Sequence, residues 1–195
     1  GGTPDQVGRL FRVTYIGGEV PPEPARASDA DPLEDQLRAL AHPAHQERMR
    51  AQQRLAKFGQ AALEPVAELL KSDQLAIVRV HAIWTQNALM DELKGYDPVP
   101  EWIAALQDSD ADVRSQAARA LGNRRIAAAR AELVQALKDP DAAVRMQAAI
   151  ALGRIGQADS ANSLYEALSE QDVVARFTMV QALRAIGNWQ LALFH

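Results

Sequence analysis

Apolar residues recur along this chain at helical spacing, and the whole pattern returns at a regular interval. The stretch DSDADVRSQAARALGNRR (108–125) is followed by the closely similar DPDAAVRMQAAIALGRIG (139–156). A Val-Arg pair marks the same place in both stretches, and an arginine occupies the corresponding place three more times. The interval between successive arginines is constant except for one longer step in the second copy: Arg48, Arg79, Arg114, Arg145 and Arg176. A self-similar period in the range of roughly 20–50 residues, where this one falls, predicts stacked supersecondary units.

Other columns of the repeat are small or apolar. Seven residues after each arginine a leucine recurs, except in the second copy, which carries Gln86 and an insertion. Three residues after each arginine stand Ala51, Ala82, Ala117, Ala148 and Met179. Each unit therefore predicts a short helix, a polar turn and a longer Ala-rich helix. Such a pair has too little core to fold alone, so its neighbours in the stack must bury it.

The turns carry signals for helix starts and stops. Asp139 before Pro140 predicts a helix start, and Ser169 with Asp172 resembles a capping box. Glycines 156 and 187 stand where a helix should end. Aspartates one turn before three of the arginines predict ion pairs within the long helices: Asp110–Arg114, Asp141–Arg145 and Asp172–Arg176.

The motif D-x-x-V-R-x-x-A-x-x-A-L-G resembles HEAT repeats of the short kind found in phycobilin lyases. The resemblance covers roughly residues 33–187. The resemblance implies an all-α, right-handed α-α superhelix of about five helix pairs. It places a repeat domain at 33–195, with repeats at about 33–59, 60–95, 97–125, 126–156 and 157–187 and a partial cap at 188–195.

Residues 1–32 differ from the repeats. Alternating residues between Gly8 and Gly18 predict a strand, and the Pro- and Ala-rich stretch that follows predicts a linker. Such a strand joined to HEAT repeats resembles large bacterial membrane-bound dehydrogenase-like proteins, in which a β-propeller precedes the repeats and a cytochrome c domain follows. This resemblance implies that the segment is the spacer of an exported, periplasmic redox protein. The start without Met suggests a processed or excised fragment.

Composition narrows the function classes. The net charge of −4 argues against nucleic-acid binding. No apolar run reaches the length of a membrane span, so we expect no membrane insertion by this segment. The absence of cysteine excludes disulfides, thiolate metal sites and cysteine nucleophiles.

Catalytic and cofactor motifs are not apparent. The acidic run at 108–112 resembles a calcium loop, but Val113 and Arg119 stand where that loop needs Gly and Glu. His42 and His45 flank a proline, which favours a surface turn over a metal site. His81 is expected at the flank of a helix rather than as a base. We therefore expect no cofactor, metal or catalytic residue. The arginine column favours a structural ladder over an anion-binding row.

The outward side of the long helices is the candidate binding surface. Helical geometry places positions one and five after each arginine opposite the core. Several of these positions are apolar, and exposed apolar patches mark contacts; the alternatives are burial by curvature or packing on a neighbouring domain. Trp84 and Phe177 are the expected anchors. The candidate partner-binding residues are Met49, Val80, Trp84, Arg119, Met146, Ile150, Phe177 and Gln181.

Two functions remain open at this stage. The first is a non-catalytic scaffold that binds a protein or flanking domains of the same chain through the concave face of its second helices. The second is a lyase-type enzyme component acting on a tetrapyrrole-carrying protein. The chemistry of a larger oxidoreductase parent would lie outside this segment.

Overall fold

The computed structural model describes residues 25–71 and 73–187 of the 195. The strand predicted between Gly8 and Gly18 and the partial cap at 188–195 lie outside the described residues. Within those residues the chain forms ten α-helices and four short 3-10 turns, and no strand.

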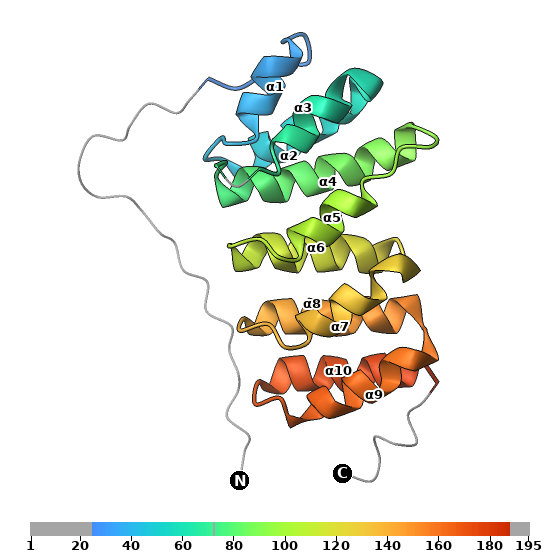
Figure 1. The fold of residues 1–195 in the computed structure, drawn as a ribbon. Helices are drawn as coiled ribbons and strands as arrows, with labels where there is room; N and C mark the ends of the chain where they lie inside the picture. Colours follow the sequence, from blue (N-terminus) through green and yellow to red (C-terminus); the bar gives the residue numbers. More distant parts are fainter. Residues whose placement is uncertain (1–24, 72, 188–195) are drawn as a thin grey trace, which may run out of the picture.

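Short and long helices alternate along the chain and form two layers (Figure 1). The first layer holds α1 (Leu33–Ala39), α3 (Leu63–Glu68), α5 (Val99–Ala105), α7 (Arg130–Ala136) and α9 (Ala161–Glu166). The second layer holds α2 (His45–Lys57), α4 (Ala76–Glu92), α6 (Ala111–Asn123), α8 (Ala142–Ile155) and α10 (Val173–Ala185). Each long helix packs against the next long helix and against the short helix before it. This confirms the all-α right-handed superhelix of five helix pairs.

Aspartate caps start the three C-terminal long helices. The carboxylate of Asp110 accepts hydrogen bonds from the amides of Asp112 and Val113, and Asp141 and Asp172 do the same for α8 and α10. The predicted start at Asp139 and the predicted capping box at Ser169 are therefore wrong. Asp139 lies too early to cap α8, which begins at Ala142; its carboxylate accepts from the amide of Asp141 and binds Arg114 of the preceding repeat. The predicted stop at Gly156 is confirmed by its left-handed φ of 75°.

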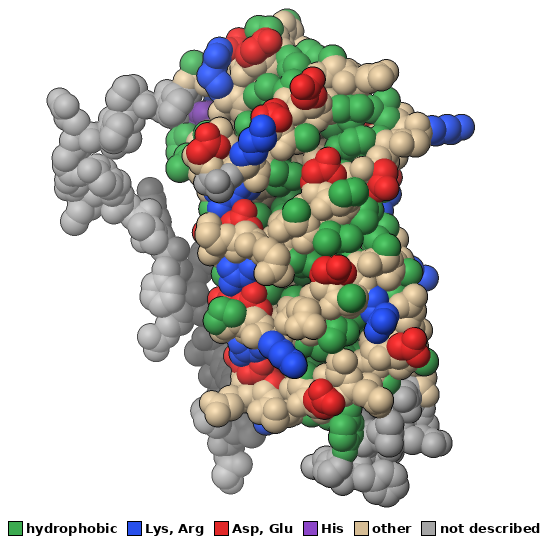
Figure 2. Space-filling model, in the orientation of Figure 1, with side chains coloured by type: hydrophobic (Ala, Val, Ile, Leu, Met, Phe, Trp, Pro, Cys, Tyr) green, Lys and Arg blue, Asp and Glu red, His purple; other side chains and the backbone are tan. Residues whose placement is uncertain are grey.

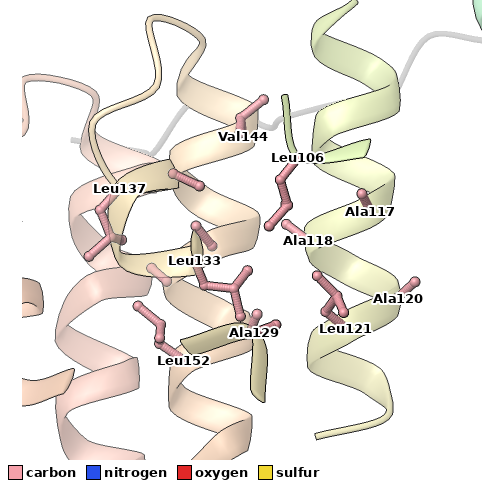
Figure 3. Packing of buried hydrophobic residues seen from close by; sticks show 14 of the residues in the cluster. Leu106, Ala117, Ala118, Ala120, Leu121, Ala129, Leu133, Leu137, Val144 and Leu152 are labelled. Carbon is pink, nitrogen blue, oxygen red and sulfur yellow. The ribbon is translucent and has the colours of Figure 1, made fainter. Parts of the chain in front are cut away.

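Small side chains hold the long helices close together. The four alanines three residues after the arginines are fully buried. A Cβ on Gly122 would lie 2.6 Å from the Cα of Ala151, and one on Gly153 would lie 2.9 Å from the Cα of Ala182. Leucines of the short helices fill the space between layers: Leu133 of α7 lies among side chains that include Leu121 and Leu152 (Figure 3).

Gln86 breaks the leucine column for a structural reason. The insertion after α4 brings Trp102 of α5 against α4, and both residues are fully buried. The indole Nε1 of Trp102 donates to Oε1 of Gln86 over 2.8 Å. A leucine at position 86 would leave that buried indole donor without a partner, which is costly.

Candidate functional site

The arginine column forms a ladder between repeats. Arg114 places Nε and Nη2 at 2.7 and 2.8 Å from the two carboxylate oxygens of Asp139, in the next repeat. Arg79 binds Asp108 in the same two-pronged way at 2.8 and 2.7 Å, and Arg145 binds Glu170. The predicted ion pairs within each helix are therefore wrong, because the aspartates one turn earlier cap the helix instead. The prediction of a structural ladder fits this geometry.

The ladder carboxylates are largely buried and remain ionised. Burial raises the pKa of Asp139, but the hydrogen bonds from Arg114 and from the amide of Asp141 outweigh it and lower the pKa below its usual value. The pKa of Asp108 is lowered by the same balance of causes. Figure 2 shows basic and acidic side chains alternating along the edge of the stack where the long helices begin. These charges neutralise one another, so the ladder offers little to an anionic partner.

A histidine replaces the carboxylate at the first rung. Nε of Arg48 donates to Nε2 of His81 over 3.1 Å, and Nδ1 of His81 lies 3.3 Å from Oε1 of Gln52. This network requires a neutral imidazole protonated on Nδ1. Burial, then the charge of Arg48, then His45 lower the pKa of His81 to about 4. His81 therefore lies inside the stack, only 4% exposed, rather than on the helix flank.

His42 and His45 do not form a metal site with His81. His42 is 6% exposed, and its Nδ1 accepts a hydrogen bond of 3.0 Å from the amide of Ala44. The prediction of a surface turn is thus wrong for this side chain, which is buried in the turn before α2. Within the described residues no cluster of three or more His, Asp or Glu is arranged to hold a metal ion.

The candidate binding residues lie on the side of the long helices opposite their buried core, a face we call the long-helix surface. Phe177 is 60% exposed and Met49 is 36% exposed. Arg119 and Gln181 are also exposed, whereas the four others are half-buried between neighbouring helices: Val80, Trp84, Met146 and Ile150. Ser115, which the same geometry places outward, is buried at 7% exposure. Residues five positions after each arginine are all exposed or half-buried, whereas residues one position after include the buried Ser115.

Trp84 is held in one orientation on this surface. Its Nε1 donates to Oε1 of Gln116 on α6 over 3.1 Å. The guanidinium carbon of Arg119 lies 5.1 Å from the centre of the Trp84 ring, a cation–π distance. The indole is thus pre-oriented with one face under a cation, which reduces the entropy lost when a partner binds.

A groove of about 550 Å³ runs between α8 and α10. Two of the candidate residues, Ile150 and Gln181, line it together with Thr178 and two arginines, Arg125 and Arg154. The sequence argument missed these arginines because it considered only two helical positions per repeat. Position nine after the column arginine, which holds Arg154, would have extended the outward face by one turn.

Two other hollows follow the repeat. One lies between α7 and α9 around Lys138 and Glu166, and another lies one repeat earlier around Gln107 and Gln135. Their lining residues correspond in register, so they are creases between successive units rather than a specialised site. Among the described helices, none combines the length and apolar character needed to cross a bilayer.

Comparison with known proteins identifies the kind of fold. Residues 99–184 match the family model of HEAT repeats. A chain in the structure of the complex of CpcE and CpcF of phycocyanin lyase from Nostoc sp. PCC7120 is similar with a TM-score of 0.63 and 20% identity, covering 77% of this chain and 96% of that one. An engineered protein is similar with a TM-score of 0.56 and 20% identity, covering 79% and 78%. No curated protein matches the sequence significantly.

Proposed function

We propose that this chain, which carries a HEAT-like segment and folds as a HEAT-like solenoid, is a non-catalytic scaffold that binds protein through its long-helix surface. The partner is another protein or a flanking domain of the same polypeptide. The observation that carries the proposal is the aromatic and apolar character of this surface, with Phe177 60% exposed. Exposed aromatic side chains at fixed positions are typical of the energetic centre of protein interfaces.

The titratable groups support a structural rather than a catalytic role. Strongly shifted pKa values often mark active sites. Here the pKa values of Asp108, Asp139 and His81 are shifted by burial and by arginines of the ladder. Each of these groups already binds a side chain within the stack, so none is positioned to exchange protons with a substrate.

The test first identifies the partner by cross-linking and then measures how substitutions on the long-helix surface change its affinity. A photoreactive phenylalanine analogue at position 177 would cross-link the partner, which is then purified and titrated by calorimetry. We expect Trp84→Ala and Phe177→Ala each to weaken binding about tenfold or more, as hot-spot residues do. Leu75→Ala is the matched control, because Leu75 is 63% exposed but lies at the turn before α4. Unchanged binding in both aromatic variants would refute the scaffold role of this surface.

A lyase-type enzyme component acting on a tetrapyrrole-carrying protein is the second candidate. The similarity to a chain of the phycocyanin lyase complex favours it. The test is to incubate the protein with an open-chain tetrapyrrole and a bilin-accepting apoprotein. A shift of the visible absorption spectrum with covalent attachment would support this function, and an unchanged spectrum would remove it.

A wider role as the spacer of an exported redox protein is proposed on the sequence resemblance to dehydrogenase-like proteins. In that arrangement the partner of the long-helix surface is a neighbouring propeller or cytochrome domain. The coding sequence on either side decides the matter: a β-propeller before the repeats and a C-x-x-C-H motif after them are expected.

A further inference from the structure

The part of the long-helix surface that α6, α8 and α10 form has a charge opposite to that of the whole chain. The chain carries a net charge of −4, yet α8 and α10 contain no Asp or Glu, and α6 contains only Asp112. Exposed arginines on or beside these helices form no ion pair among the described residues: Arg119, Arg125, Arg154 and Arg184. Acidic side chains are therefore scarce on α6, α8 and α10. The positive charge of the exposed arginines attracts anions.

Two of these arginines are held in place on successive helices. The Arg119 guanidinium on α6 lies over the Trp84 ring, 5.1 Å from its centre. Nη1 of Arg154 on α8 donates a hydrogen bond to the Oδ1 of Asn123 on α6. Each guanidinium keeps other N–H groups that no described side chain engages, and these can donate to a carboxylate.

Apolar and amide groups line the same groove as two of the cations. Ile150 and Thr178 line the groove between α8 and α10, and Arg154 and Arg125 line the same groove. Gln181 faces it from α10. A ligand in this groove therefore meets cations, apolar contacts and a hydrogen-bonding amide together.

This pattern favours a polypeptide over a nucleic acid. A nucleic-acid site needs a dense basic footprint and flat stacking platforms, whereas Trp84 has one face covered by Arg119.

We infer that the partner of this surface is an acidic, amphipathic peptide segment, bound with its carboxylates on Arg119 and Arg154 and an apolar side chain against Ile150. This inference rests on the proposed scaffold function and adds the chemistry of the partner. Charge attraction speeds the encounter and selects the partner, while the apolar contacts with Ile150 and Phe177 slow its release.

A defined probe tests the inference with the chain as it exists. The probe is a fluorescein-labelled peptide that alternates Glu, Leu, Asp and Ala, and its control replaces Glu and Asp by Gln and Asn. Fluorescence anisotropy measures both affinities at low and high salt. We expect the acidic peptide to bind about tenfold tighter or more than the neutral one, and this advantage to shrink as salt rises.

Substitutions locate the effect. Arg119→Gln and Arg154→Gln together should remove the preference for the acidic peptide. The matched control is Arg130→Gln, which removes one charge from the start of a short helix in the other layer and should leave both affinities unchanged. Because the two target arginines are exposed, circular dichroism of the variants should match that of the parent chain.

Four outcomes would overturn the inference: equal affinity for the two peptides, no binding of either peptide, an equal loss in Arg130→Gln, or tighter binding of a single-stranded oligonucleotide. The scaffold proposal is judged separately. Suppose that Trp84→Ala and Phe177→Ala weaken the binding of the cross-linked partner while the arginine variants leave it unchanged. That result would support the scaffold proposal and refute only the acidic character of the partner.

Discussion

At the scale of single residues, the absence of a side chain determines how closely two helices approach. Gly122 of α6 and Gly153 of α8 occupy the same place in successive repeats, and each faces an alanine of the following long helix. The space for a Cβ at these positions is already taken by Ala151 and Ala182. The two glycines therefore act as contact points between repeats, although both stand inside helices, where glycine is normally unfavourable.

Replacing Gly122 by alanine should destabilise the protein. Helix propensity alone favours alanine by about 1 kcal/mol, but the added methyl would force α6 and α8 apart, and such overpacking costs about 1–3 kcal/mol. We expect a lower free energy of unfolding in urea titration. A gain in stability would mean that the two helices can separate freely.

His81 makes one rung of the ladder sensitive to pH. Its pKa is about 4 in the folded chain, against about 6.5 in an unfolded chain. Between these values the unfolded chain binds the additional proton, so stability is full above about pH 6.5 and declines as the pH falls toward 4. Below the folded pKa both states are protonated and the loss is complete.

The variant His81→Gln isolates this effect, because its amide oxygen can still accept from Arg48 but does not titrate. Between pH 7 and 4 the parent chain should lose about 1–3 kcal/mol of unfolding free energy more than the variant. Parallel denaturant titrations at several pH values measure the difference. Identical pH profiles for the two chains would contradict the assignment of a neutral buried imidazole.

At the scale of elements, the ladder connects the second, third and fourth repeats each to the next by a planar, two-pronged bond. Arg114 binds both carboxylate oxygens of Asp139, and its Nη1 also donates to the carbonyls of Asp108 and Ser109 in the turn before its own helix. One side chain thus joins three segments. The pair is largely buried, at 13% and 9% side-chain exposure, so removal of one partner leaves the other uncompensated.

Arg114→Lys tests this geometry, because lysine keeps the positive charge but lacks the two parallel N–H donors of the guanidinium. We expect a loss of about 1–3 kcal/mol, since the lysine cannot satisfy both oxygens and the turn carbonyls together. Arg38→Lys is the control: Arg38 pairs with Asp35 within α1 and is 75% exposed, so the substitution should change stability by well under about 1 kcal/mol. Equal effects at the two sites would show that the ladder adds little.

At the scale of the whole molecule, the buried core is uneven along the stack. One large buried cluster extends from Ile83 of α4 to Leu183 of α10. The N-terminal repeats hold two smaller clusters, around Leu55 and around Val66. In a stack of units that contact only their neighbours, stability is close to a sum of interface terms, so we expect the two ends to open before the centre.

Hydrogen exchange should report this gradient. Amides of α6 and α8 should exchange most slowly, because both helices are covered on two sides by other long helices. Amides of α1 should exchange fastest among the helices, since α1 packs mainly on α2. Equal protection of α1 and α8 would mean that the stack unfolds as one unit.

Much of the fold was predictable because the same pattern of apolar and small residues recurs in successive repeats. Helical periodicity, the alanine column and Gly156 all report on local geometry, which a short window of sequence contains. The partners of the ladder were not predictable in the same way. Arg114 has an aspartate one turn before it, and nothing in one repeat indicates that Asp139 of the next repeat binds the arginine while Asp110 caps the helix.

The sequence by itself determined the secondary structure, the period and the class of fold, because these follow from side-chain spacing along one helix and its turn. Only the tertiary structure decided which charges pair and that His81 is neutral and buried. Those outcomes depend on the distance and burial between groups that belong to different repeats. That geometry exists only once neighbouring repeats have stacked.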